Sequence, residues 1–344
     1  MSRLRIAVLS GGKSSEHEVS RSSGAGVLAG LNAVQYEVTP VDISRDGRWS
    51  TDGHPVALAV DGDGAPTLAS LNGSPSRPLD VVFPVLHGPF GEDGAVQGVC
   101  DTVGLACVGS GVAASAMAMD KAICKDLMRQ AGIPTCDGIL VLGPDWASDP
   151  VRVHQRVMDE IGVTCFVKPA RLGSSVGISR VTDETALDAA IALALSHDPR
   201  VLIERAVVGA EVEVGILGND DVDVSPVGQI LYDAEWYDYE TKYEAGRMQL
   251  AVPANIPAEV AARVQSLGRD AFRTLGCRGL ARIDFFATAA GEVLISEINT
   301  IPGFTPTSVY AKLFEAGGIA YGDLLDRLIA LALADFADRA RYRS

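Results

Sequence analysis

Short apolar runs alternate with longer amphipathic stretches over the first third of the chain. Residues 4–9, 36–41 and 81–86 have the continuous apolar character of buried strands. Residues 15–31 and 94–102 have the spacing of helices. This alternation of strands and helices predicts a parallel sheet with helices on both of its faces.

Two segments lack such a pattern. Residues 44–78 contain many Gly, Asp and Pro residues, which predict solvent-exposed loops with no assigned role. The arginine-rich tail 339–343 is predicted to be frayed and solvated.

Beyond residue 118 the pattern changes to strands that suit antiparallel pairing, with helices between them. Asp120 has the side chain of a helix N-cap, and its helix is expected to end near Ala131, before Gly132. This part of the chain is therefore expected to be α+β. Further strands are predicted at 164–167, 177–181, 201–204 and 211–217, and further helices at 184–195, 258–275 and 323–337.

Composition and charge narrow the class of protein. At 344 residues the chain is too long for one ordinary core and predicts two or three domains. The formal net charge of −15 argues against general nucleic-acid binding, but it leaves room for a local basic pocket. The 6 cysteines have no metal-ligand spacing, no apolar run reaches membrane-spanning length, and the start lacks a signal peptide. We expect a cytoplasmic protein that binds neither nucleic acid nor membrane.

Two strands near the C-terminus carry four polar side chains in a regular pattern. Residues 279–286 and 292–299 are predicted to form a hairpin. If residues 290–291 are a two-residue turn, all four polar side chains lie on one face of the hairpin. The opposed pairs are then Asp284 with Glu297 and Arg282 with Asn299.

This face of the hairpin predicts a metal site. Two carboxylates at that separation repel each other unless a cation lies between them. Oxygen ligands without His or Cys favour a hard ion such as Mg²⁺, which commonly shares its coordination with substrate phosphates. The hairpin by itself is equally compatible with a surface ion pair across the strands.

A first candidate phosphate loop follows the first strand. The sequence Gly12-Lys13-Ser14 suggests a P-loop, but that motif needs a glycine where this chain has Ala7. What remains is a strand-to-helix turn whose amides favour an anion, with Glu16 at the carboxyl edge of the sheet. A purely structural interpretation is a capping box between residues 15 and 18.

A second glycine-rich segment, residues 168–177, lies between two strands. Its amides could fold over phosphates as a flap, with Lys168 at the end of the preceding strand. An ordinary glycine hairpin is the alternative. Lys121, directly after the cap, is a further candidate for a phosphate contact, although a single lysine is usually a solvated charge.

Seven segments in this order resemble the D-alanine–D-alanine ligases of the ATP-grasp superfamily. The resemblance extends from about Arg5 to about Leu333, and the order of the segments makes it specific although each is weak alone. The segments are 11–20, 86–94, 119–121, 168–169 with 173–177, 238–243, 282–284 and 297–303.

The resemblance implies a multidomain α/β and α+β fold. Residues 1–118 would form an N-terminal parallel-sheet domain, Rossmann-like and of the pre-ATP-grasp type, that binds substrate. A two-part ATP-grasp fold would follow, with a central subdomain at 119–212 carrying the phosphate loop. The C-terminal subdomain, 213–344, would carry the metal site and a lid loop. The family also suggests a homodimer.

The resemblance also implies catalytic and substrate-binding residues. Glu16 would receive the ammonium of the first D-alanine, with His87 nearby. Arg282 and the amide of Gly303 would stabilise the tetrahedral intermediate. Ser174 and Tyr243 would be the partners of Glu16 that tie the lid over the site, and Ser308 and Val309 would contact the second D-alanine.

ATP and magnesium are the implied co-substrate and cofactor. Two Mg²⁺ ions, for which Mn²⁺ can substitute, would be held by Asp284, Glu297 and Asn299. The residues implied for ATP are Lys121, Lys168, Gly173, Ser174, Ser175, Val176, Glu204, Val207, Glu211, Lys242 and Asn299.

The implied reaction has two steps. The carboxylate of the first D-alanine attacks the γ-phosphate of ATP to give an acyl phosphate and ADP, and the amine of the second D-alanine then displaces phosphate. Because an acyl phosphate hydrolyses readily, a lid must exclude water. The aromatic and charged stretch 232–248 suits such a lid, whereas an ordinary loop explains its aromatic residues poorly.

Three alternatives stay open. A ligase that joins D-alanine to D-lactate or D-serine would share the fold, although Lys242-Tyr243 argues against the lactate type. A natural-product peptide ligase would share it too. A non-catalytic nucleotide-binding protein is disfavoured, because the paired carboxylates would have no task in it.

Overall fold

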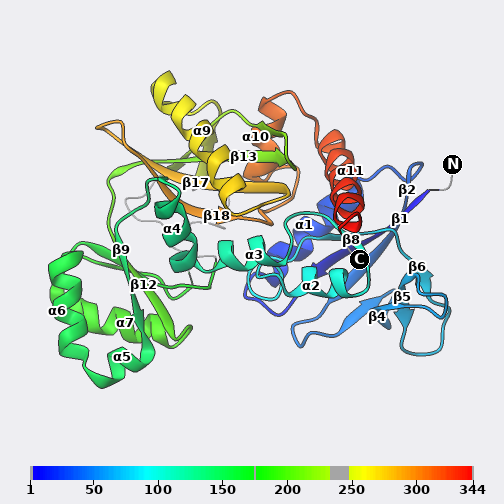
Figure 1. The fold of residues 1–344 in the computed structure, drawn as a ribbon, viewed down its shortest axis with the longest axis horizontal. Coiled ribbons are helices and arrows are strands. Elements are labelled where there is room, and N and C mark those ends of the chain that lie inside the picture. The colour runs from blue at the N-terminus through cyan, green and yellow to red at the C-terminus, as the bar shows by residue number, and fades with distance from the viewer. Residues whose placement is uncertain (1–2, 174–175, 233–247, 343–344) are drawn as a thin grey trace.

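Three β-sheets organise the chain (Figure 1). The computed structural model describes residues 3–173, 176–232 and 248–342. The strand-rich multidomain α/β and α+β fold expected from the sequence is confirmed. Within the described residues, no helix is both long and apolar enough to cross a membrane.

The first sheet contains the predicted parallel strands. Apolar side chains on one face pack against α1 (His17–Gly30) and α11 (Tyr321–Ala340), and those on the other face pack against α2 (Ala95–Thr102). The parallel strands are β1 (Leu4–Gly11), β2 (Tyr36–Ile43), β7 (Val81–Pro84) and β8 (Ala106–Cys107).

The segment 44–78 is not a set of loops, and that prediction was wrong. Its strands extend the first sheet with antiparallel pairing. Leu58 pairs with Leu68, and Val56 and Leu68 are buried. The alternation of apolar residues is strand-like, but the surrounding Gly and Asp residues of the hairpin turns mask it. These strands are β3 (Trp49–Thr51), β4 (His54–Val60), β5 (Pro66–Ser70) and β6 (Arg77–Pro78).

The second sheet is antiparallel and has the order β11-β10-β12-β9. Its apolar face packs against α6 (Pro150–Glu160) and α7 (Leu187–Leu195). A short helix α5 (Gly143–Ser148) and a 3₁₀ turn (Glu184–Ala186) complete this lobe, which lies apart from the rest in Figure 1. The strands are β9 (Gly138–Leu142), β10 (Cys165–Pro169), β11 (Ser179–Val181) and β12 (Arg200–Arg205).

The third sheet has the order β16-β15-β13-β17-β18, with β14 paired to β13. Helices α3 (Val112–Met119), α4 (Lys121–Gln130) and α9 (Ala258–Thr274) pack against one face of it, and α10 (Val309–Ala316) contacts β13. The strands are β13 (Gly209–Gly218), β14 (Val222–Val224), β15 (Gly228–Tyr232), β16 (Met248–Ala251), β17 (Gly279–Thr288) and β18 (Val293–Asn299).

The hydrophobic cores do not follow contiguous stretches of the chain. Residues of α3 and α4 share a core with the third sheet, and leucines of α11 share one with the first sheet. The expected boundary at 212/213 falls inside β13, which is continuous from Gly209 to Gly218. The chain therefore crosses between lobes more often than the three expected domains suggest.

Both ends of α4 match the sequence. The Asp120 side chain accepts hydrogen bonds from the amides of Ala122 and Ile123, as an N-cap should. At the other end, Gly132 has a φ of 75°, and the Ile133 amide donates to the Met128 carbonyl. The predicted span of this helix is thus confirmed.

The beginning of α1 and the end of α11 differ from prediction. No side chain caps α1, so the capping box between residues 15 and 18 does not form. Instead, Ser14 Oγ accepts from the Glu16 amide and donates to the His87 carbonyl. Arg339 is not part of a frayed tail, because its guanidinium lies 2.6 Å from Asp101 and anchors the last turn of α11.

We predict that α11 contributes substantially to stability through its buried leucines. Leu328 is 0% exposed within the core shared with the first sheet. Leu328→Ala should lower the free energy of unfolding by about 2–5 kcal/mol, because it leaves a cavity in a packed core. Urea denaturation measures this change. The control Leu193→Ala, at a site 47% exposed, should change it by less than about 0.5 kcal/mol.

Candidate functional site

A cavity of about 670 Å³ gathers the predicted site residues from all three sheets. Val176 is described but is not part of the cavity wall. Ser174, Ser175, Lys242 and Tyr243, and almost all of the predicted lid 232–248, lie outside the described residues. The predicted residues that line the cavity are Glu16, His87, Lys121, Lys168, Gly173, Glu204, Val207, Glu211, Arg282, Asp284, Glu297, Asn299, Gly303, Ser308 and Val309.

The hairpin β17–β18 has the predicted pairing but a different turn. Asp284 pairs with Glu297 and Arg282 with Asn299, as expected. The turn is not two residues long, because the Thr288 amide donates to the Glu292 carbonyl and leaves three residues between them. A bulge between Asp284 and Phe285 then shifts the pairing by one residue. The bulge and the longer turn compensate each other, so the predicted pairs form.

Arg282 lies between two carboxylates in this hairpin. Its Nε and Nη2 atoms donate to Asp284 at 2.8 and 2.7 Å, and Nε lies 3.0 Å from Glu213 on β13. Burial disfavours the charged guanidinium, but Asp284 and Glu213 outweigh burial and raise the pKa of Arg282. The Asn299 amide also donates to Asp284, at 3.0 Å. Arg282 is thereby fixed as a permanent cation at the cavity wall.

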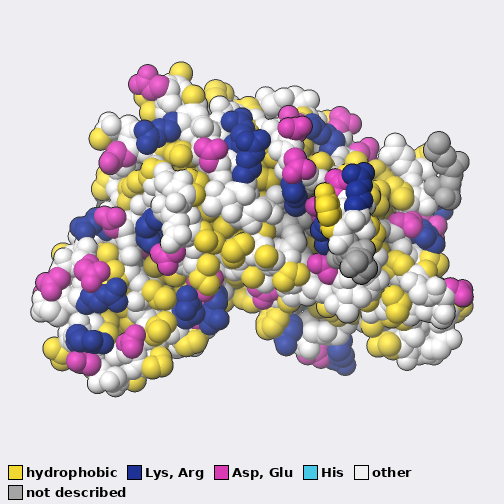
Figure 2. Space-filling view, in the orientation of Figure 1, with side chains coloured by type: hydrophobic (Ala, Val, Ile, Leu, Met, Phe, Trp, Pro, Cys, Tyr) yellow, Lys and Arg dark blue, Asp and Glu magenta, His cyan; other side chains and the backbone are white. Residues whose placement is uncertain are grey.

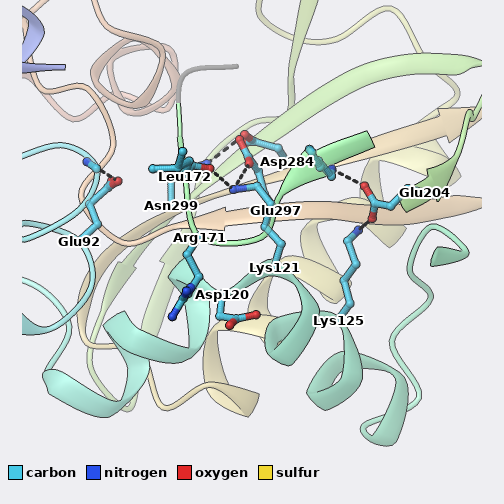
Figure 3. A network of polar contacts seen from close by, with 12 residues as sticks. Glu92, Asp120, Lys121, Lys125, Arg171, Leu172, Glu204, Asp284, Glu297 and Asn299 are labelled. Carbon is cyan, nitrogen blue, oxygen red and sulfur yellow. Dashed lines mark hydrogen bonds and ion pairs between the residues drawn. The ribbon is translucent and has the colours of Figure 1, made fainter. Parts of the chain in front are cut away.

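Lys121 connects the hairpin to the glycine-rich loop. Its ammonium donates to the Leu172 carbonyl at 2.8 Å and lies 3.4 Å from Glu297 (Figure 3). The cap Asp120 is in turn held by Arg200 of β12 at 3.0 Å. The start of α4 therefore places the Lys121 ammonium between the glycine-rich loop after β10 and Glu297 of β18.

Lys168 and Glu204 form a second charged group on the cavity wall. The Lys168 ammonium contacts Glu204 Oε2, and Lys125 of α4 lies 2.6 Å from Glu204 Oε1. Burial acts to raise the pKa of Glu204, but the two lysines outweigh it and hold that pKa at about 2. Burial likewise disfavours the Lys168 cation, but Glu204 outweighs it and raises the pKa of Lys168. Glu204 and Lys168 are therefore both charged at neutral pH.

Glu16 lies where the first sheet meets the glycine-rich loop. A Cβ atom at Gly88 or Gly173 would lie 2.9 or 3.0 Å from Glu16 Oε2, so both backbones approach this carboxylate closely. Glu92 lines the same end of the cavity and accepts from the Gly88 amide at 2.9 Å. Burial, and then Glu16, raise the pKa of Glu92 to about 8.

His87 is fully enclosed and hydrogen-bonded through both ring nitrogens. Nδ1 lies 2.9 Å from the Ile301 carbonyl, which can only accept, so Nδ1 carries the proton. Nε2 lies 2.9 Å from the Ser23 hydroxyl, which also accepts from the Phe304 amide. Burial lowers the pKa of His87, and the neutral ring satisfies every contact.

The segment after β18 places Gly303 beside Ser308. A Cβ atom at Gly303 would lie 3.3 Å from Ser308 Oγ, which accepts from the Thr305 amide at 2.9 Å. Val309 follows as the first residue of α10. The predicted oxyanion amide and the predicted carboxylate-binding hydroxyl are thus neighbours.

Sequence reasoning missed Glu92, Lys125 and Glu213. Lys125 follows Lys121 by one helical turn and therefore shares its face of α4. Glu213 alternates with Glu211 on β13 and therefore shares its face of the sheet. These periodicities were visible in the sequence, but they do not by themselves distinguish an inward face from a solvated one.

The hairpin offers a metal ion two carboxylates and an amide. Within the described part of the chain, no three His, Cys, Asp or Glu side chains form a cluster that could hold a metal by themselves. Asp284, Glu297 and Asn299 are all oxygen donors on one wall of the cavity. This set fits Mg²⁺, which needs few protein ligands when phosphates and waters complete its coordination.

The chain is similar to known proteins over nearly its whole length. Residues 5–110 match the family model "D-ala D-ala ligase N-terminus", and residues 127–330 match "D-ala D-ala ligase C-terminus". A D-alanine–D-alanine ligase of Deinococcus radiodurans is 47% identical over 97% of this chain and 99% of its own length.

Two solved structures have the same fold over nearly their full length. The D-alanine–D-alanine ligase of Coxiella burnetii superimposes with a TM-score of 0.89 at 33% identity, covering 99% of this chain and 97% of the other. The VanG D-Ala:D-Ser ligase of Enterococcus faecalis does so with 0.87 at 33% identity, covering 96% and 100%.

We predict that His87 makes stability pH-dependent on the acidic side. Because its folded-state pKa lies below the unfolded value of about 6.5, the unfolded chain binds the extra proton. Stability should therefore fall as the pH drops below about 6.5. His87→Asn keeps a donor for the Ile301 carbonyl but does not titrate, so its unfolding free energy should fall less between pH 7.5 and 5.5. Equal losses in urea denaturation would contradict this assignment.

Proposed function

The chain belongs to the D-alanine–D-alanine ligase family, and we propose that this cavity is where it joins two D-alanine molecules with the use of ATP. The enzyme is an ATP-dependent ligase whose product, D-alanyl-D-alanine, serves peptidoglycan synthesis. The observation that carries the assignment of the cavity is that Lys121, Lys168, Arg282 and the Asp284–Glu297 pair all line it.

ATP binds between the second and third sheets in this proposal. Lys121 and Lys168 contact its phosphates, because both ammoniums line the cavity wall. The glycine-rich loop from Gly173 covers those phosphates. The base and ribose occupy the end of the cavity lined by Phe166, Ile178, Val207 and Glu211.

Asp284, Glu297 and Asn299 are the proposed magnesium ligands. When bound there, Mg²⁺ supplies positive charge that neutralises the phosphate oxygens during phosphoryl transfer. Arg282 stays beside these ligands with Glu213 as a counter-ion of its own at 3.0 Å. The guanidinium therefore remains paired when Asp284 turns to the metal.

The two amino acids occupy the part of the cavity lined by Glu16, Gly303 and Ser308. Glu16 accepts a hydrogen bond from the ammonium of the first D-alanine. The glycine-rich loop, which lies close to Glu16, brings the ATP phosphates next to the carboxylate of that D-alanine. Arg282 and the Gly303 amide donate to the oxygen that becomes negative when the second amine attacks. Ser308 binds the carboxylate of the second D-alanine. Ser174 and Tyr243 remain the proposed partners of Glu16.

We further propose that the enzyme acts in the cytoplasm, where ATP is available, as a homodimer. Val99 on α2 and Val112 on α3 are 42% and 41% exposed, and these helices contact each other. Apolar side chains gather over α3 on the face shown in Figure 2. A second copy could cover this surface.

Replacing one metal ligand tests the assignment of the hairpin. Glu297→Gln removes the negative charge but keeps the shape, so ADP release with D-alanine and Mg²⁺ should fall by more than about 100-fold while the fold remains. Glu292→Gln, on the exposed turn of the same hairpin, is the matched control and should keep full activity. Unchanged activity of the Glu297 variant would refute the metal site.

The second substrate is tested by competition at neutral pH. Coupled ADP release is measured with D-alanine alone and with D-alanine plus D-lactate or D-serine, and the products are identified. We expect D-alanyl-D-alanine to be the main product. More turnover with D-lactate or D-serine would make the enzyme a ligase of that type, and Val309 would then be the first residue to vary.

A further inference from the structure

Lys125 is a buried lysine with no task in the reaction described above. Lys125 is 1% exposed and does not line the cavity, whereas Lys121, Lys168 and Glu204 do. Its ammonium lies 2.6 Å from Glu204 Oε1. Figure 3 shows it reaching Glu204 from α4. A lysine of this kind cannot touch ATP, so any effect on the nucleotide must pass through another residue.

The group formed with Lys168 contains one carboxylate and two ammoniums. Glu204 is 4% exposed and is shared between Lys125 and Lys168, one on each oxygen. If Lys168 turned toward a phosphate and Glu204 had no other partner, a buried carboxylate would be left uncompensated, which is strongly unfavourable. With Lys125 in place, Glu204 keeps a counter-ion at all times.

Contacts with two other elements hold the Lys125 side chain in place. It lies one turn after Lys121 on α4, whose N-terminus is capped by Asp120. The Lys125 ammonium also donates to the Ile295 carbonyl of β18 at 3.3 Å. Lys125 therefore links β12 of the second sheet to β18 of the third, the two walls between which the nucleotide is proposed to lie.

We propose that Lys125 is a positioning residue for ATP: it neutralises Glu204 permanently and thereby releases Lys168 to bind the phosphates. This inference rests on the proposed role of Lys168. Without Lys125, Glu204 would hold Lys168 for itself, and the phosphates would lose a cation. ATP affinity should fall, whereas D-alanine binding, which is proposed to use Glu16 and Ser308 rather than Lys168, should not change.

The test is a double-mutant cycle on ATP binding. The dissociation constant for ATP with Mg²⁺, without D-alanine, is measured by calorimetry for wild type, Lys125→Met, Glu204→Gln and the double variant. Lys125→Met should weaken ATP binding by about tenfold or more in the wild-type background, the range typical of outer partners of a site. In the Glu204→Gln background the same change should cost less than about twofold, because no carboxylate competes for Lys168.

Steady-state kinetics adds a second readout. Lys125→Met should raise the KM for ATP by about the same factor and leave the KM for D-alanine within about twofold. Lys125→Arg, which keeps the charge, should largely restore ATP binding. Lys312→Met, on the surface of α10, is the control lysine and should change nothing.

Two results would overturn the proposal. One is unchanged ATP affinity in Lys125→Met, and the other is an equal loss in both backgrounds, which would indicate a general structural role. If Lys125→Met does not fold, Lys125→Gln removes the charge while keeping a hydrogen-bonding side chain, and the same cycle decides. Because ADP release by the wild-type enzyme is measured separately, a failure of this inference is distinguishable from a failure of the proposed function.

Discussion

The cavity depends on pairing every buried charge with an opposite one. Burying an isolated ion costs several kcal/mol, so a cavity that must attract a polyanion cannot simply be lined with lysines. Here cations and carboxylates alternate along the wall and behind it. The cations are Lys121, Lys125, Lys168 and Arg282, and the carboxylates are Glu204, Glu213, Asp284 and Glu297.

These pairs also suggest how the ligand-free protein stays stable before its substrates arrive. Lys121 pairs with Glu297, and Arg282 pairs with Asp284. In each pair, the cation is the proposed ligand of a phosphate or of the oxyanion, and the carboxylate is a proposed ligand of the metal. On these roles, bound ATP and Mg²⁺ would give both members of each pair a new partner of opposite charge.

The overall charge of the chain describes its local sites only coarsely. A net charge of −15 argues against a nucleic-acid-binding face but does not specify the charge inside a pocket. The cations that matter lie in a local pocket, and most of them are held by acidic neighbours. The acidic excess of the chain therefore coexists with a site for an anionic substrate, since a buried site responds to charges within a few ångström rather than to the total.

The sequence by itself determined the parallel strands, the capped helix at Asp120 and the face shared by Arg282 and Asp284, because these depend on periodicity and on neighbours along the chain. It even predicted the pair Asp284–Glu297, although a three-residue turn and a bulge produce that pair together.

Only the tertiary structure decided which lysine faces the cavity and which lies behind it, and that Glu213 holds Arg282. It also decided that 44–78 extends the first sheet and that α11 packs against that sheet. The physical reason is that burial and charge pairing are set by segments that are distant in sequence, and a local pattern contains no information about which segment will cover it.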